Sequence, residues 1–108
     1  MLPTIERRGG QRKPMKTKAL ISVDSKSPVW VRTVDLSENG VGLATPEPVR
    51  IGAPARVRFE LSFDGQSQPV EARGTIAYCM LSGDEFKVGI TFTQVDVAAM
   101  MLISKFLK

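Results

Sequence analysis

Apolar and polar residues alternate along much of the chain, as expected for strands with one buried face. The clearest example is residues 55–63, where every second residue is apolar and the residues between are mostly charged. The same period predicts further strands over 15–23, 29–36, 41–44, 70–80 and 86–92. Turn residues separate them, and Asp64-Gly65 is a hairpin signal. Residues 45–54 contain three prolines and a glycine, which predicts a loop.

The period changes after Phe92, where a helix is predicted over 94–107 with Thr93 as its N-cap in a capping-box pattern. The helix is apolar along two stripes, formed by Ala98, Met101, Leu102 and Phe106 and by Met100, Ile103 and Leu107. It either seals an open barrel end or also contacts a partner or a second copy of the chain, which would give a homodimer. Six strands followed by one helix indicate an all-β fold, a six-stranded antiparallel β-barrel with a C-terminal α-helix.

The composition fits one domain, placed at residues 15–108. The 108 residues can bury one modest core, and 43% hydrophobic content indicates a folded chain. No apolar run approaches the roughly 20 residues of a membrane span. The N-terminus lacks the apolar region of a signal peptide, and Cys79 has no cysteine with which to pair, so we expect a cytoplasmic protein. Trp30 is expected in the core or at the barrel rim.

The formal charge is +4, and the basic excess lies near the N-terminus. The basic residues there are Arg7, Arg8, Arg12, Lys13, Lys16 and Lys18. With Gly9-Gly10 and Pro14, residues 1–14 are predicted to form a flexible basic arm. Such an arm binds an anionic partner, or it is a solvated tail without one.

Catalysis is not expected, because the chain has no histidine and therefore lacks the commonest general base and metal ligand. The single cysteine, Cys79, cannot build a zinc site of the usual kind and has no histidine to activate it. The sequence therefore predicts a binding protein with no metal site and no cofactor.

Asp35 and Ser37 end the second predicted strand, two residues apart and hence on the same face. Glu38, Asn39 and Gly40 then form a predicted tight turn, in which Asn-Gly tolerates positive φ. A carboxylate beside a hydroxyl suits an N–H-rich ligand edge such as that of guanine. The alternative is that both side chains bond their own turn backbone, and this segment alone favours that alternative.

The arm and the turn carry two spaced motifs, RxxxR at Arg8 to Arg12 and DxSxxG at Asp35 to Gly40. Together they resemble the PilZ domain family, whose members bind the bacterial second messenger cyclic di-GMP. Residues 71–76 and 88–92 look like later strands of that family, so the resemblance runs from about residue 6 to residue 92.

The resemblance implies a function for each motif residue. Arg8 and Arg12 would hold phosphates and guanine Hoogsteen edges, Asp35 and Ser37 would read guanine, and Gly40 would keep the turn clear of the base. Arg7, directly before the motif, would go with capture of two intercalated cyclic di-GMP molecules. The family's spacer usually carries bulkier residues than Gly-Gly-Gln, so ordering the arm is expected to cost more and affinity to be modest.

The implied function is a cyclic di-GMP receptor or adaptor that signals to a protein partner. One alternative is a basic barrel that binds nucleic acid through the arm and Arg56, Arg58 and Arg73. The low aromatic content, 6%, argues against it, because stacking platforms need aromatic residues among the basic ones. Another alternative is a PilZ-like interaction adaptor that uses its helix and binds little ligand.

Overall fold

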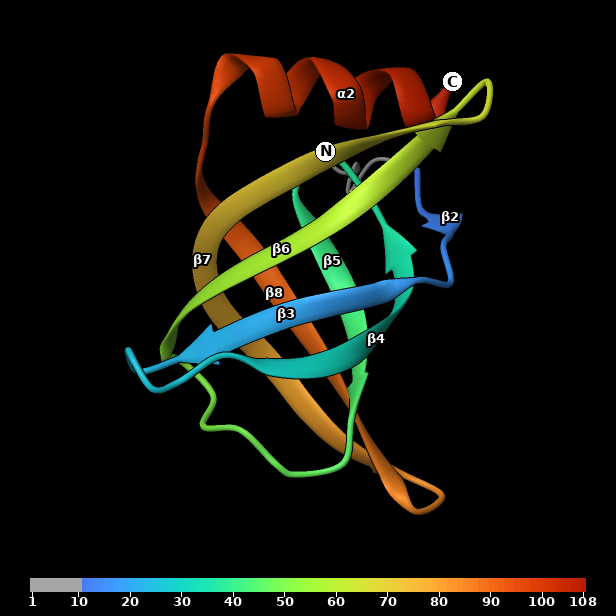
Figure 1. Ribbon diagram of the computed structural model, residues 1–108. Helices are drawn as coiled ribbons and strands as arrows, with labels where there is room; N and C mark the ends of the chain where they lie inside the picture. Colours follow the sequence, from blue (N-terminus) through green and yellow to red (C-terminus); the bar gives the residue numbers. More distant parts are fainter. Residues whose placement is uncertain (1–10) are drawn as a thin grey trace, which may run out of the picture.

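The computed structural model describes residues 11–108, and Figure 1 shows a barrel of strands with a helix across one end. The strands are β2 (Lys13–Pro14), β3 (Lys18–Val23), β4 (Val29–Leu36), β5 (Gly40–Thr45), β6 (Pro54–Phe63), β7 (Gln66–Ser82) and β8 (Glu85–Val95), and the helix is α2 (Val97–Leu107). All strand pairs are antiparallel, in the order β2-β4-β3-β6-β7-β8-β5.

An additional pairing of β5 with β4 closes the ring, so six strands form the barrel. Strand β2 pairs with the C-terminal end of β4. Closure removes the unpaired edges that an open sheet of this size would expose. The predicted six-stranded antiparallel barrel with a C-terminal helix is therefore confirmed. At the β6–β7 hairpin, Asp64 and Gly65 both take positive φ, 50° and 82°, as the hairpin signal predicted.

The barrel interior is filled by the inward residues of the alternating strands. In β6, Ala55, Val57, Phe59 and Leu61 are all buried, as their spacing predicted. Other strands contribute Ile21, Leu36, Val41, Leu43, Val70, Ile76, Val88 and Ile90. Burying one such aliphatic or aromatic side chain contributes about 1.5–3 kcal/mol, so this core is what holds the surface residues of the strands in place.

Strand β8 continues to Val95, and this corrects the predicted start of the helix. Arg73 pairs with Gln94 and Ala72 with Val95, so Thr93 lies in a strand and caps no helix. The helix begins at Val97 rather than at residue 94, and its N-cap is Asp96, whose carboxylate accepts a hydrogen bond from Ala99 N at 2.7 Å.

Helix α2 lies across the barrel end formed by β6 and β7 (Figure 1). Its buried residues are Ala99, which belongs to neither predicted stripe, and Ile103 of the second stripe. Met101 of the first stripe and Met100 of the second are exposed, so neither stripe is buried as a whole. Trp30 was expected in the core or at the barrel rim; it is 65% exposed, which excludes the core position. Among residues 11–108 no helix is long and apolar enough to cross a membrane.

Candidate functional site

The short strand β2 brings the end of the RxxxR motif to the end of β4. Pro14 pairs with Asp35 and Lys13 with Leu36, which places Arg12 directly beside the DxSxxG motif. Arg12 Nε lies 3.3 Å from Asp35 Oδ2, and the two side chains are 47% and 24% exposed. Two motifs that are distant in the sequence therefore meet in one ion pair.

Asp35 is held by an irregularity in β4. The register with β5 shifts between Thr33 and Asp35, and Asp35 then stands opposite Gly42. A Cβ at Gly42 would lie 2.5 Å from Asp35 Oδ1, so the glycine makes room for the carboxylate. This Oδ1 is buried and has no hydrogen-bond partner within residues 11–108. Within the described residues this one oxygen of Asp35 is thus an acceptor without a donor, which costs about 1–3 kcal/mol when buried.

Ser37 and Gly40 shape the turn after β4. The Ser37 hydroxyl donates to Gly40 O and accepts from Asn39 N, both at 3.3 Å, so it bonds its own turn backbone. Neither Asn39 nor Gly40 takes positive φ, so that part of the turn prediction was wrong. Gly40 is needed for a different reason: a Cβ there would lie 2.2 Å from Ile90 O of the neighbouring strand.

A cavity of about 150 Å³ opens beside this turn. It is lined by Arg12, Ser37, Asn39, Gly40, Ala77, Tyr78, Gly89, Ile90 and Thr91. Unbroken alternation along β7 would place Tyr78 on the same face as the buried Ile76, but the register shifts between these two residues and the Tyr78 ring lies in the cavity wall. A Cβ at Gly89 would lie 2.1 Å from the Tyr78 ring, so Gly89 creates the place for it. A lone tyrosine in an alternating segment carries no sequence signal for this position.

Lys13 connects the site to helix α2. Its ammonium group donates a hydrogen bond to Phe106 O at 2.9 Å and lies 4.6 Å from the centre of the Phe106 ring. A cation is favoured at the C-terminal end of a helix, and it is also attracted to an aromatic face. Neighbouring residues of the basic segment thus contact Asp35 on one side and the helix on the other.

The structure brings together four of the six predicted site residues. Arg12 contacts Asp35, and Arg12, Ser37 and Gly40 line the same cavity. Arg7 and Arg8 lie outside the described residues. Within residues 11–108 no group of three or more acidic or cysteine side chains could hold a metal ion. The arrangement offers a guanidinium and an aromatic ring at one hollow, with the Asp35 carboxylate in contact with that guanidinium, which suits a planar, anionic ligand.

A closed antiparallel barrel with a capping helix, and a polar cluster where two strands meet, define a small all-β domain. Residues 6–108 match the family described as PilZ domain, and the chain belongs to that family. No curated protein sequence matches this chain.

Solved structures of low sequence identity share the fold. The Bacillus subtilis inhibitor of motility (MotI/DgrA) superposes with a TM-score of 0.83 at 12% identity, over 94% of this chain and 50% of that one. The PlzA protein of Borreliella burgdorferi, solved in complex with c-di-GMP, gives 0.70 at 16% identity, over 94% and 41%. The PilZ domain of CeSA from a cellulose-synthesizing bacterium gives 0.59 at 18% identity, over 91% and 95%. This chain thus spans half or less of the first two proteins.

Proposed function

We propose that this chain is a non-enzymatic receptor for cyclic di-GMP. The observation that carries the proposal is the contact of Arg12 with Asp35 beside the cavity at the β4–β5 turn. This contact joins the two motifs of the PilZ family at one place, and a PilZ-fold neighbour, PlzA, was solved with c-di-GMP.

The chemistry of each residue fits this ligand. The Asp35 carboxylate is 24% exposed beside Arg12, and it can accept from the N–H donors that guanine presents on one edge. The Arg12 guanidinium can pair with phosphate or with guanine O6 and N7, and Arg8 would add a second fork from the arm. The Tyr78 ring in the cavity wall provides a face on which a base can stack. The Ser37 hydroxyl donates a hydrogen bond to the turn backbone at Gly40 O, and Gly40 allows Ile90 O of the neighbouring strand to approach closely.

Two ligand molecules per domain follow from Arg7, which precedes the RxxxR motif. An intercalated pair of cyclic di-GMP molecules presents four bases and four phosphate charges. A third arginine therefore gains both a stacking surface and an anion to neutralise. The charge of this ligand also predicts that binding weakens strongly at high salt.

The signal would pass to a protein partner through helix α2. Lys13 contacts Phe106 in the last turn of the helix, and Arg12 is the adjacent residue. A ligand that draws Arg12 towards a phosphate therefore also displaces the contact with the helix. The exposed side chains of Met100 and Met101 give the helix an apolar outer surface, which a partner or a second copy of this chain could cover.

Calorimetric titration with cyclic di-GMP, GTP and single-stranded DNA tests the proposal. Cyclic di-GMP should bind and the other two should not. Arg12→Ala and Asp35→Ala should each lose about 2–4 kcal/mol of binding, the scale for truncating one partner of a buried charged pair. Wild-type affinity in both variants would refute the assigned site.

The stoichiometry has its own test. The wild type should saturate at two ligands per chain, and Arg7→Leu should lower the ratio towards one without abolishing binding, because the remaining motif is intact. Saturation of the wild type at one ligand would contradict the paired arrangement while leaving the receptor function standing.

A further inference from the structure

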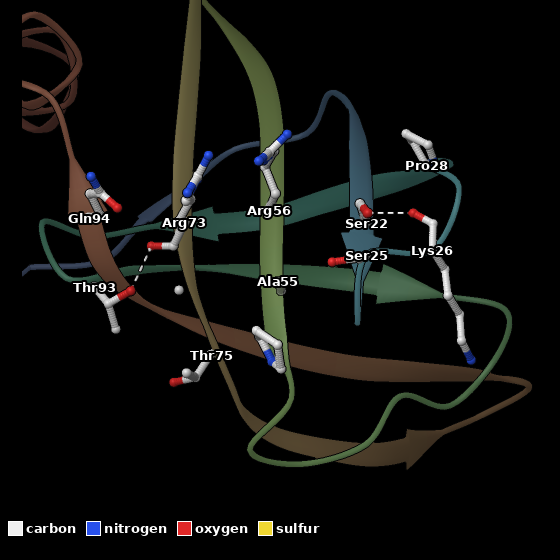
Figure 2. Close-up of a pocket in the computed structure, with 12 residues that line it drawn as sticks. Ser22, Ser25, Lys26, Pro28, Ala55, Arg56, Arg73, Thr75, Thr93 and Gln94 are labelled. Carbon is white, nitrogen blue, oxygen red and sulfur yellow. Dashed lines mark hydrogen bonds between the residues drawn. The ribbon is translucent and has the colours of Figure 1, made fainter.

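A second hollow lies on the outer wall of the barrel (Figure 2). It neighbours the cavity beside Arg12, because its Thr75 pairs across the strands with Thr91 of that cavity. Its volume is about 600 Å³, within the range of small-molecule pockets, roughly 300–1,000 Å³. It is lined by Ser22, Ser25, Lys26, Pro28, Pro54, Ala55, Arg56, Arg73, Gly74, Thr75, Thr93 and Gln94. None of these residues lines the first cavity.

Two arginines stand side by side in this hollow. Arg56 of β6 and Arg73 of β7 are direct cross-strand partners, and Figure 2 shows their side chains extending in the same direction. Like charges directly opposite each other on neighbouring strands destabilise the pairing. An anion bound between the two guanidinium groups would relieve this repulsion.

The protein supplies little compensating negative charge of its own. Among residues 11–108 no carboxylate lines the hollow. Arg73 makes no ion pair within residues 11–108, and Arg56 reaches a carboxylate of Glu71 only at 3.8 Å. By contrast, Arg32 Nη2 lies 2.6 and 2.8 Å from the two carboxylate oxygens of Glu85, and this hydrogen bonding raises the pKa of Arg32.

A strand irregularity helps to set Arg73 in place. The register between β7 and β8 shifts between Arg73 and Gly74, and the Thr93 hydroxyl donates to Arg73 O at 3.4 Å. Bulges of this kind change the direction of a side chain and are common beside binding sites. At Gly74 a Cβ would lie 2.0 Å from Thr91 O, so a glycine is required for β8 to approach there.

We propose that the hollow between Arg56 and Arg73 is a second, independent anion site that binds a phosphate-bearing small molecule. Two parallel guanidinium forks match the oxygens of a phosphate group. Ser25 and Thr75, which also line the hollow, add hydroxyls. The rings of Pro28 and Pro54, which line the hollow, give apolar contact area for the organic part of a phosphate ester.

The test is an amide NMR titration of the full chain, first with inorganic phosphate and then with GMP. Both should shift the amides of Gly74, Thr75 and Thr93 saturably, also in protein that is already saturated with cyclic di-GMP. Tighter binding of GMP than of phosphate would identify a phosphate ester as the ligand, and equal affinity would identify the phosphate group alone. Shifts confined to the region of Gly40 and Gly42 would overturn the proposal.

Two variants distinguish a specific binding site from nonspecific attraction of anions to a positively charged surface. Arg73→Gln should weaken GMP binding at least tenfold and should not lower the melting temperature, because it removes a repulsion. Arg58→Gln is the matched control, since Arg58 is exposed on β6 and lies outside the hollow; it should change affinity less than twofold. Equal losses in the two variants would overturn the proposal. So would tighter binding of a glutamate-rich peptide or of single-stranded DNA than of GMP.

Discussion

Replacing Asp35 with alanine should leave the ligand-free domain as stable as the wild type, or make it more stable, although it removes an ion pair. The lost contact is the pair with Arg12, whose side chain is 47% exposed, and exposed pairs of this kind contribute about 0.2–1 kcal/mol. The same change removes a buried carboxylate oxygen that has no donor within residues 11–108, and relieves a cost of about 1–3 kcal/mol. The balance is a gain of roughly 0–3 kcal/mol, and a gain of 1 kcal/mol raises the melting temperature of a domain this size by about 4–8 °C.

Denaturant unfolding of ligand-free protein measures this balance, and calorimetry measures cyclic di-GMP binding in the same variant. Higher stability combined with lost binding is the mark of a residue kept for its ligand. Glu38→Ala is the control, because Glu38 is exposed in the adjacent turn and makes no ion pair within residues 11–108; it should change neither quantity by more than about 0.5 kcal/mol. If Asp35→Ala lowered the free energy of unfolding by more than about 1 kcal/mol, the carboxylate would be a structural part of the turn and the reasoning would fail.

Three further outcomes are expected. Ile103→Lys should unfold the domain or destabilise it by several kcal/mol, because Ile103 is 3% exposed, whereas Met100→Lys at 53% exposure should leave circular dichroism melts unchanged. Gly89→Ala should weaken cyclic di-GMP binding, measured by calorimetry, because its Cβ would displace the Tyr78 ring. Cyclic di-GMP should alter amide hydrogen exchange in helix α2 of the wild type, and Lys13→Gln, which removes the cation at Phe106 O, should abolish that change; an unchanged effect in the variant would disprove transmission through this contact.

The barrel could be predicted from the sequence because each strand has one buried face. In β6 the alternation fixes which residues point inward regardless of which strands lie beside it. The same holds for the hairpin at Asp64-Gly65, where the two residues themselves favour positive φ. In these cases a local pattern is enough, since the structure that it favours does not depend on distant parts of the chain.

The walls of both hollows depend on strand irregularities, which the sequence does not reveal. The shift between Ile76 and Tyr78 turns the tyrosine into the first cavity, and the shift at Arg73 accompanies the second hollow. A bulge places an extra residue of one strand opposite a single residue of its partner. Its position therefore depends on how β7 and β8 pair in the closed barrel. Gly40 could be assigned to a turn from the sequence. The close approach of Ile90 O, which is what requires a glycine there, depends on the neighbouring strand and could not be predicted.

Helix α2 shows how a distant pairing overrides a local signal. Thr93 and Asp96 are both good N-cap residues, and the sequence pattern favoured Thr93. Pairing of Gln94 and Val95 with β7 extends β8 past Thr93, so the helix begins only after Asp96. A short-range capping preference of about 1 kcal/mol cannot outweigh ladder hydrogen bonds that the barrel has already formed.

Strand β2 is the part of the described chain best suited to respond to a ligand. It has only the two residues Lys13 and Pro14, both exposed, and proline has no N–H to donate to the ladder. Its pairing with β4 is therefore weak compared with the long ladders of the barrel, and regions of few buried contacts open at low free-energy cost. Arg12 immediately before it contacts Asp35, while Lys13 contacts the end of helix α2. In the proposed receptor, a ligand that competes for Arg12 would act on the weakest strand, and the barrel would stay rigid while the contact with the helix changes.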